Sequence, residues 1–302
     1  MLATGGKSRI GRSTMVQAIK KGVLYLVGTP IGNLEDITYR AVRVLREASV
    51  IACEDTRQTR KLLDHYGIAL PTISYHEHNE AERAAELVRK LEEGLNLAQV
   101  SDAGMPGISD PGFRVITLAI ECGITVVPVP GPSALTAALV GSGLPTDAFE
   151  FLGFLPAKSG QRRTTLELLR PSRRTIVVYE APHRIRGALQ DIAEILGPSR
   201  PVVVARELTK IHEEFIRGTA DQVLSRLQAH EPKGEITLLI GPGEVSREPT
   251  AGKDLAARLH EIVSEQKLDE KAALKVLAKE HGVSKSEVYR ELQRTKVVKD
   301  RH

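Results

Sequence analysis

The sequence predicts an α/β protein with two α/β domains and a short helical segment at the C-terminus. Short β-branched runs alternate with helix-length amphipathic segments from Val23 onward. A cluster of turn-forming residues at 143–147 interrupts this alternation. Gly- and Pro-rich loops directly follow several apolar runs, and at the carboxyl ends of strands such loops present bare backbone to a ligand.

The first domain is expected at residues 23–147, as a mostly parallel sheet covered by helices. Short apolar or β-branched runs predict strands at Val23–Val27, Val50–Glu54, Thr72–Tyr75, Leu97–Val100 and Thr125–Val129. Amphipathic segments between them predict helices at Ile37–Ala48, Thr56–Tyr66, Glu80–Glu93, Phe113–Glu121 and Ser133–Gly141.

The second domain is expected at 148–242, beginning with the run Phe149–Phe154. Its further strands are predicted at Thr175–Tyr179, Val202–Arg206 and Ile236–Ile240, with an edge or hairpin strand at Glu214–Arg217. Helices are predicted at His183–Leu196 and Ala220–Gln228. Residues 245–252 are predicted to be a linker.

The C-terminal segment, residues 253–302, is predicted to be helical. Asp269–His281 is rich in Ala, Leu and Lys, and Gly282 and Ser284 supply a helix end and a new helix start before Lys285–Arg294. Two helices joined by a short Gly-containing turn resemble a helix-turn-helix, whose second helix would offer a basic side to a phosphate backbone. The alternative is a helical hairpin that only packs on the body.

The composition describes a protein able to bury cores, with 41% apolar and 26% charged residues. The absence of Trp and the 4% of aromatic residues weigh against an RNA platform based on stacking. Cys53 and Cys122 fit a reducing cytoplasm and lack metal-type spacing, so neither a disulfide scaffold nor a metal site is predicted. No signal peptide or membrane-spanning stretch is recognised.

The net charge of +4 is distributed unevenly along the chain. Residues 1–22 carry +5, residues 251–302 carry +3, and the part between them carries −4. This distribution predicts that the ends grip a polyanion while the body is not generally basic. Residues 1–22 are expected to be a flexible basic arm or simply a poorly ordered terminus.

Four Gly/Pro loops form the predicted ligand site. Gly allows a ligand to approach the main chain, and Pro fixes φ. The first loop is neither a Walker loop nor Gly-x-Gly-x-x-Gly, so ATP and NAD are poorly supported. The loops are Gly28–Asn33, Ser101–Gly107, Ser109–Gly112 and Pro128–Ala134.

The segments 24–34, 53–57, 101–112 and 130–134 resemble the tetrapyrrole methylase superfamily, the class III S-adenosylmethionine methyltransferases. The motifs Thr29–Asp36, Glu54–Arg57, Ser101–Gly112 and Glu180–Arg184 are similar to the branch that methylates cytidine 2′-hydroxyls of small-subunit (16S) ribosomal RNA. The resemblance covers about 23–242, and a helical tail is also typical of that branch.

The resemblance implies an S-adenosylmethionine cofactor in the cleft between the domains, and a homodimer. Met105 stands where relatives are expected to carry Thr, which is harmless if its main chain makes the contact. By motif position the implied cofactor contacts are Pro30, Ile31, Asp102, Gly104, Met105, Pro106, Ile108, Ser133, Ala134, Tyr179, Glu180, Ala205 and Thr237.

The implied reaction is attack of a ribose oxygen on the sulfonium methyl, for which positioning and a base would provide the acceleration. Glu54, Asp55 and Glu180 with His183 are the candidate groups. Adjacent carboxylates on a strand point to opposite faces, and Asp55 is favoured because it lies at the strand-to-loop transition. The alternative for Asp55 is a helix N-cap, and the alternative for His183, otherwise a proton or phosphate contact, is a surface residue.

Basic residues near these motifs are candidate RNA contacts, since counterion release favours such clusters on a polyanion. The alternative is a solvated helix surface. The candidates are Arg57, Arg60, Lys158, Arg162, Arg163, Arg173, Arg174 and Arg184, with Arg170 in the same run.

The leading hypothesis is therefore a cytidine 2′-O-methyltransferase acting on 16S ribosomal RNA or the small subunit. One alternative is a small-molecule methyltransferase with a tetrapyrrole-like acceptor, which would not require the basic ends. Another is a non-enzymatic helix-turn-helix nucleic-acid binder, for which loss of 251–302 would abolish all function.

Overall fold

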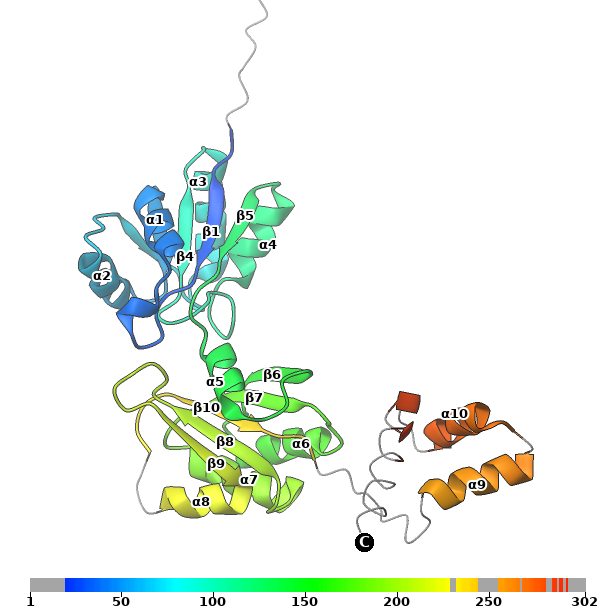
Figure 1. Ribbon diagram of the computed structural model, residues 1–302. Helices are drawn as coiled ribbons and strands as arrows, with labels where there is room; N and C mark the ends of the chain where they lie inside the picture. The colour runs from blue at the N-terminus through cyan, green and yellow to red at the C-terminus, as the bar shows by residue number, and fades with distance from the viewer. Residues whose placement is uncertain are drawn as a thin grey trace, which may run out of the picture. The chain divides into compact units, whose positions relative to one another are not determined.

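The structure is a computed structural model that describes residues 20–228, 232–243, 255–266, 268–280, 284–286, 288–289 and 292. It separates into two compact units, Met1–Gly243 and Glu244–His302. The larger unit contains two five-stranded sheets with helices around them (Figure 1). The predicted α/β class is confirmed.

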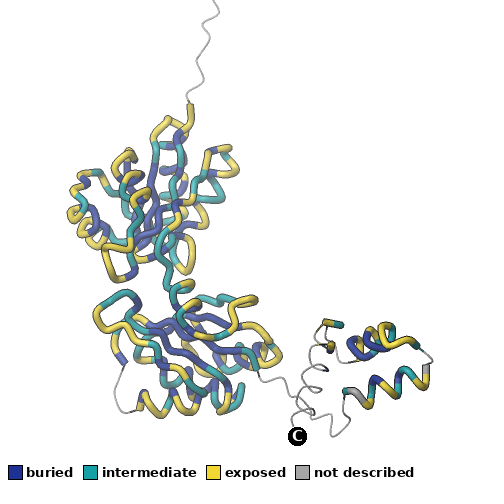
Figure 2. Tube along the Cα trace, viewed as in Figure 1, coloured by how far each residue is buried: buried dark blue, intermediate teal, exposed yellow. Residues whose placement is uncertain are grey.

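The first sheet is parallel throughout and has the strand order β3-β2-β4-β1-β5. Helices α1 and α2 pack on one face and α3 and α4 on the other, and the inner strands β2 and β4 are buried throughout (Figure 2). The strands are β1 (Val23–Val27), β2 (Val50–Cys53), β3 (Thr72–Ser74), β4 (Leu97–Val100) and β5 (Thr125–Val129). The helices are the 3₁₀ turn η1 (Leu34–Asp36), α1 (Tyr39–Glu47), α2 (Thr56–His65), α3 (Glu80–Glu92) and α4 (Phe113–Glu121).

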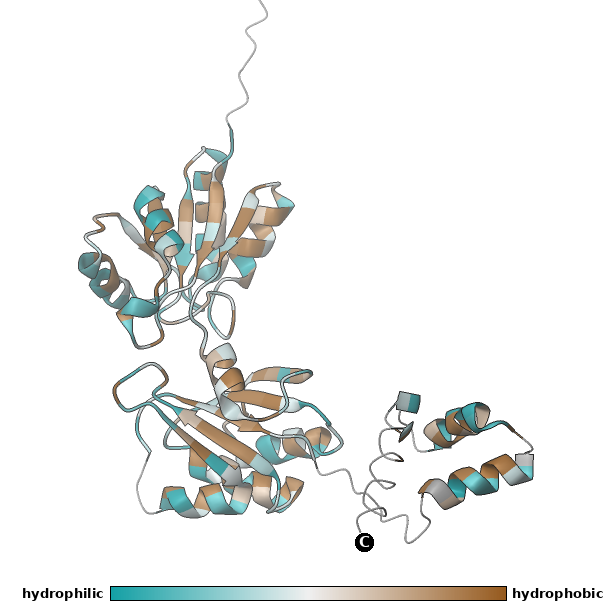
Figure 3. Ribbon diagram, viewed as in Figure 1, coloured by the Kyte–Doolittle hydropathy of each residue, from teal (hydrophilic) through white to brown (hydrophobic). Residues whose placement is uncertain are grey.

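The second sheet has the order β6-β7-β10-β8-β9, and only its β6/β7 pair is parallel. It comprises β6 (Phe149–Phe154), β7 (Thr175–Glu180), β8 (Pro201–Arg206), β9 (Glu214–Thr219) and β10 (Ile236–Ile240). One face packs on α5 (Ala134–Ser142), and the other packs on α6 (Ser159–Leu169), α7 (Ile185–Leu196) and α8 (Ala220–Gln228). Both faces are therefore apolar, and the central strands are predominantly hydrophobic (Figure 3).

Side-chain alternation distributes these strands between two cores. Val177 and Val203 face α5, whereas their neighbours Val178 and Val204 face the core of α6, α7 and α8. The α5-side core also includes Ile31, which comes from the loop after β1, and Leu208 from the loop after β8. The two sheets are thus joined by shared apolar contacts as well as by the chain.

Most predicted elements have the observed type, with ends within two residues of those predicted, and Glu214–Arg217 lies in an edge strand that forms a hairpin with β8. Helix α6 was not predicted as an element, because its residues stand out in sequence as a basic run rather than as an amphipathic pattern. Helix α7 begins at Ile185 rather than at His183.

The smaller unit contains α9 (Leu255–Gln266), α10 (Glu270–Glu280) and further helical residues between 285 and 292. Leu259, Ile262, Leu277 and Val288 are buried together in its core. The predicted helix at Asp269–His281 corresponds to α10, while that at 285–294 and the basic arm at 1–22 lie largely outside the described residues. None of the helices in the described part is long and apolar enough to cross a membrane.

Candidate functional site

Three of the Gly/Pro-rich segments meet at one edge of the first sheet. Strands β4, β1 and β5 are neighbours and run parallel, so the loops after them leave from the same side. Thr29 and Gly104 join two of these loops by reciprocal backbone hydrogen bonds, with N–O distances of 2.9 Å from the Thr29 N–H and 3.1 Å from the Gly104 N–H. The predicted convergence of the loops is therefore observed.

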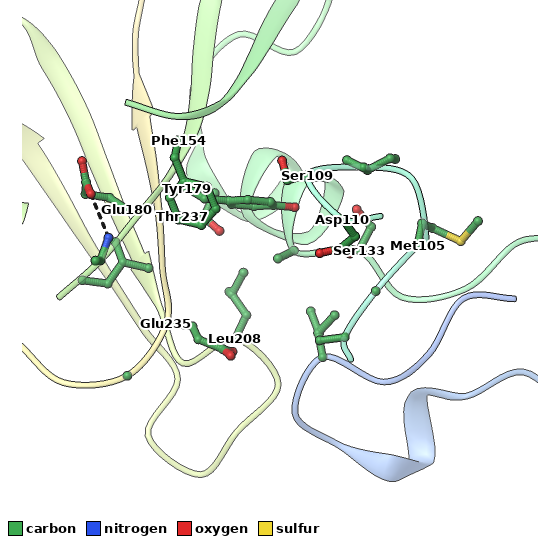
Figure 4. A pocket seen from close by; sticks show the side chains of 18 of the residues that line it. Met105, Ser109, Asp110, Ser133, Phe154, Tyr179, Glu180, Leu208, Glu235 and Thr237 are labelled. Carbon is green, nitrogen blue, oxygen red and sulfur yellow. Dashed lines mark hydrogen bonds between the residues drawn. The ribbon is translucent and has the colours of Figure 1, made fainter. Parts of the chain in front are cut away.

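A cavity of about 300 Å³ opens between these loops and the second sheet (Figure 4). This volume is at the lower end of the range for small-molecule sites. The first sheet's loops contribute Ile31, Ala103, Gly104, Met105, Ile108, Ser109, Asp110, Ser133 and Ala134. The second half contributes Phe154, Tyr179, Glu180, Ala181, Pro182, Leu208, Gly234, Glu235, Ile236 and Thr237.

Nine of the thirteen residues that the family resemblance implied as cofactor contacts line this cavity. The other four lie beside it. Ala205 is fully buried in the core beneath the cavity, Pro106 is buried, and Pro30 is half-buried next to Ile31. Asp102 is exposed, and its Oδ1 accepts a hydrogen bond of 3.0 Å from the Asp55 backbone N–H.

Met105 faces the cavity with its main chain. Figure 4 shows its side chain directed away from Tyr179 and Asp110. Its sulfur lies 2.7 Å from where a Cβ on Gly28 would stand, so the thioether packs toward the loop after β1. The Met105 side chain therefore adds no polar group to the cavity in place of the Thr hydroxyl expected at this position.

Asp110 is a carboxylate inside the cavity that the sequence did not single out. Its half-buried side chain lies near Ser133 and Tyr179 (Figure 4). Burial, followed by the charge of Glu54, raises the pKa of Asp110 to about 6, while a hydrogen bond with Ser101 opposes that shift. Asp110 thus titrates close to neutral pH, which suits a group that takes up a proton.

Asp55 lies outside the cavity and caps α2. Its Oδ1 accepts a hydrogen bond of 2.8 Å from the Arg57 backbone N–H, and its Oδ2 lies 2.7 Å from the Arg57 guanidinium. These hydrogen bonds to Arg57 lower the pKa of Asp55 to about 2. The helix-cap alternative is therefore observed, and a carboxylate with so low a pKa is a weak base. Asp55 is not retained as the candidate base.

Glu54 is half-buried near the same edge but does not line the cavity. Burial, together with the charges of Asp102 and Glu77, raises the pKa of Glu54. The negative charge of Glu54 is in turn one of the causes that raise the pKa of Asp110. Glu54 is therefore near the cavity but is not one of its lining groups.

Glu180 lines the cavity at the end of β7, with a fully buried side chain. Its Oε1 accepts a hydrogen bond of 2.8 Å from the Ala181 N–H and lies 3.0 Å from Arg184 Nε. Burial raises the pKa of Glu180, and these two contacts oppose the shift. His183 is exposed outside the cavity wall, as its surface-residue alternative describes.

The predicted RNA-binding residues divide into two groups. Arg57, Arg162, Arg163 and Arg184 are ion-paired with Asp55, Asp191, Glu194 or Glu180. Within the described residues, no ion pair involves the exposed side chains of Arg60, Lys158, Arg173 and Arg174.

Arg162 does not present its charge to the surface. Its Nη2 lies 2.6 Å from Asp191 Oδ2, and the two side chains are 9% and 8% exposed. Arg162 therefore belongs to the packing between α6 and α7, and we remove it from the candidate RNA contacts.

Sequence reasoning also missed the apolar residues of the second half of the cavity. Phe154 is 56% exposed at the end of β6, with its ring centroid 5.7 Å from that of Tyr179. Leu208 comes from the loop between β8 and β9. Phe154 is the last residue of a predicted strand, and this position could have marked it as a cavity residue. No feature of the sequence marks Leu208 in the same way.

Comparisons with known proteins find relatives that match most of this chain. The chain is 48% identical over 272 residues to "Ribosomal RNA small subunit methyltransferase I" of Halalkalibacterium halodurans, covering 89% of this chain and 94% of that protein. The Escherichia coli O157:H7 protein of the same name is 44% identical over 272 residues, with the same coverage of 89% and 94%.

Solved structures show the same fold. Uroporphyrin-III-C-methyltransferase from Thermus thermophilus superposes with a TM-score of 0.53 at 23% identity, covering 73% of this chain and 94% of that chain. Residues 23–224 match the family described as Tetrapyrrole (Corrin/Porphyrin) Methylases. With two thirds of its length matched and the loop-lined cavity in place, the chain belongs to the tetrapyrrole methylase family.

Proposed function

We propose that this protein transfers a methyl group from S-adenosylmethionine to the 2′-hydroxyl of a cytidine in 16S ribosomal RNA. The substrate class is supported by relatives named ribosomal RNA small subunit methyltransferase I, which are 44–48% identical over 89% of the chain. The choice of a cytidine ribose rests on the motifs Glu54–Arg57 and Ser101–Gly112 and on a carboxylate in the cavity.

S-adenosylmethionine is the methyl donor of the tetrapyrrole methylase family. The residues of the cavity fit such a ligand. The first turn of α5 begins at Ala134, and the free N–H groups of a helix start favour a carboxylate such as that of the methionine moiety. Ile31 and Leu208 provide apolar surface, and Gly104 and Met105 provide main-chain groups. When bound, the donor supplies a methyl group activated by a positively charged sulfur.

Asp110 is the base in this proposal. A ribose hydroxyl is weakly acidic, so its attack is helped by a carboxylate that accepts the proton as the new C–O bond forms. Asp110 lies in the cavity itself, and its pKa of about 6 leaves it ionised but still basic at pH 7 to 8. Positioning of the acceptor by the two halves of the cavity would supply the remaining acceleration.

The observation that carries the proposal is this half-buried carboxylate in the cavity that the proposed cofactor loops line. A methyl acceptor that must lose a proton needs such a group within reach, and the Asp55 side chain is already engaged with Arg57. Tyr179, whose pKa burial raises, remains protonated nearby and is available to orient a polar group.

The decisive experiment measures transfer of labelled methyl from S-adenosylmethionine to ribosomal RNA and to isolated small subunits. The product nucleosides are then identified by mass spectrometry. A 2′-O-methyl group blocks alkaline cleavage at its own nucleotide, so an alkali-resistant dinucleotide with methylated cytidine is expected. Label on a base, or transfer only to a tetrapyrrole precursor, would refute the proposed acceptor.

We also propose that the protein is a homodimer, as the family resemblance implies. Helix α4 supports this with apolar surface, since Phe113 and Ile120 are 75% and 60% exposed. Light scattering on the purified chain is expected to give twice the monomer mass of 33.0 kDa. A monomeric mass at micromolar concentration would contradict the dimer without affecting the proposed chemistry.

A further inference from the structure

Helix α10 has one buried face and one lysine-rich face. Its apolar residues Ala273, Leu274, Leu277 and Ala278 are buried in the core of the smaller unit. The exposed positions include three lysines spaced four residues apart, which we call the lysine stripe: Lys271, Lys275 and Lys279. With about 1.5 Å of rise per residue, the stripe extends over about 12 Å of the helix axis.

No acidic residue lies three or four residues from a stripe lysine, the spacings at which side chains meet on a helix surface. Glu270 and Glu280 are neighbours of the stripe in sequence, and Glu280 pairs with Arg258. The positions three and four residues away from each lysine are occupied by Lys, Ala, Leu, Val or Gly. Several cations on other helices are paired within about one turn, as in Arg43–Glu47, Arg83–Glu86 and Arg258–Glu261. In the part of the chain that the structure describes, no ion pair involves the three stripe lysines.

Helix stability does not account for this pattern. Like charges four residues apart repel each other on a helix surface. Lys271 also lies in the first turn, where the positive end of the helix dipole disfavours a cation. Only Lys279, in the last turn, is favourably placed. A bound polyanion would remove both unfavourable interactions.

We propose that the lysine stripe of α10 binds the phosphate backbone of ribosomal RNA. The choice of RNA as the polyanion rests on the proposed function. The charges themselves are a property of the smaller unit alone and do not depend on the methyl-transfer site. Contacts of this kind position a substrate without reading its sequence, so the stripe would raise RNA affinity while the cavity selects the acceptor.

The test is RNA binding by the full chain, with a fluorescent RNA hairpin as the probe and no cofactor present. Lys271, Lys275 and Lys279 are replaced together by Gln, which has a helix propensity close to that of Lys. The matched control removes three exposed arginines from other helices by the substitutions Arg43→Gln, Arg89→Gln and Arg226→Gln. Both variants lose the same net charge.

Counterion release makes the expected result quantitative. Each lost phosphate contact lowers the slope of log K against log salt by about 0.7 to 0.9, so the stripe variant should lose about 2 from that slope and bind about tenfold more weakly. The control variant should keep most of the salt slope measured for the unmodified chain. A restored affinity in the triple Lys→Arg variant is expected, because the contact requires charge.

Equal losses in the stripe and control variants, or an unchanged salt slope in the stripe variant, would overturn the proposal. Calorimetric titration with S-adenosylmethionine separates this outcome from failure of the proposed function. Cofactor binding by the stripe variant should match that of the unmodified chain. If RNA binding depends on the stripe but no methyl transfer occurs, the inference holds and the proposed activity fails.

Discussion

Gly28 and Gly131 lie against each other where the loops after β1 and β5 meet. A Cβ on Gly28 would stand 2.8 Å from the Gly131 Cα, and a Cβ on Gly131 would stand 2.9 Å from the Gly28 Cα. The contacting atoms of both glycines belong to the backbone, which cannot move aside as the end of a flexible side chain can. The two glycines therefore allow the close approach of two loops, one of which leads into α5 and the cavity.

Replacing Gly131 by Ala is expected to separate these loops and to weaken binding of S-adenosylmethionine by at least about tenfold, since misplacing main-chain groups costs affinity directly. Calorimetric titration measures this loss. The matched control is Gly160→Ala in α6, where an added Cβ meets nothing within 4 Å and Ala favours the helix. Equal affinity of both variants would show that the loop contact does not shape the site.

Asp110→Asn is expected to lower the methyl-transfer rate about 10²-fold or more while leaving cofactor binding intact, because it removes the base but keeps the side-chain shape. In the unmodified protein, the rate should rise with pH through about 6, as Asp110 loses its proton. Single-turnover rates between pH 5 and 8 test both statements. A rate that is unchanged by the substitution, or independent of pH, would remove Asp110 as the base.

The same substitution should raise stability at neutral pH. The folded-state pKa of Asp110 is raised from 3.8 to about 6, so the folded protein holds this proton more tightly than the unfolded chain. Ionisation of Asp110 therefore lowers the free energy of unfolding as pH rises from about 4 through 6. Asp110→Asn should increase Tm at pH 7.5 and have little effect near pH 4. A lower Tm at pH 7.5 would contradict the burial argument.

The fold followed from the sequence because the strands carry their own pattern. Val23–Val27, Leu97–Val100 and Ile236–Ile240 were predicted with the bounds that the structure has. Their order in the sheets was not predictable, since it depends on packing between distant segments. Helix α6 was overlooked because Arg162 occupies a buried position, and a buried ion pair interrupts the apolar periodicity on which sequence reasoning relies.

The site was predicted where the main chain forms it and less well where side chains do. Ile31, Gly104 and Ser133 could be placed because Gly and Pro mark the loops that carry them. Asp110 follows β4 by ten residues, so its return to the cavity depends on the path of the loop. Asp55 directly follows a strand, but the start of α2 engages its carboxylate. Position after a strand alone therefore did not point to Asp110, the base proposed above.

Asp55→Asn should leave methyl transfer nearly unchanged, because Asn also caps helices and the carboxylate is absent from the cavity. Asp55→Ala should lower Tm through loss of the cap, with cofactor affinity retained. The pKa of Asp55 is lowered to about 2, so its stabilising contribution is present above pH 4 and is lost as pH falls through about 2. A large loss of turnover in the Asn variant would restore Asp55 as a participant in the chemistry.

Arg162 and Asp191 form the buried link between α6 and α7. Besides the contact of 2.6 Å between Arg162 Nη2 and Asp191 Oδ2, Arg162 Nε donates to the same oxygen at 2.8 Å. Asp191 also accepts from Arg163 Nη1 at 2.8 Å. One carboxylate therefore serves two guanidinium groups, and only that of Arg163 is substantially exposed.

Arg162→Gln is expected to reduce the free energy of unfolding by roughly 1.5 to 3 kcal/mol, because it removes buried charge-assisted hydrogen bonds while Arg163 still pairs with Asp191. Urea titration measures this change. Replacing the exposed Arg173 by Gln should cost less than about 0.5 kcal/mol. The two variants also separate structure from substrate contact: folded Arg162→Gln protein should keep the RNA affinity of the unmodified chain, measured below its unfolding transition. If Arg162→Gln instead weakened RNA binding at unchanged stability, the guanidinium would have to reach the substrate, and the buried position of this pair would be refuted.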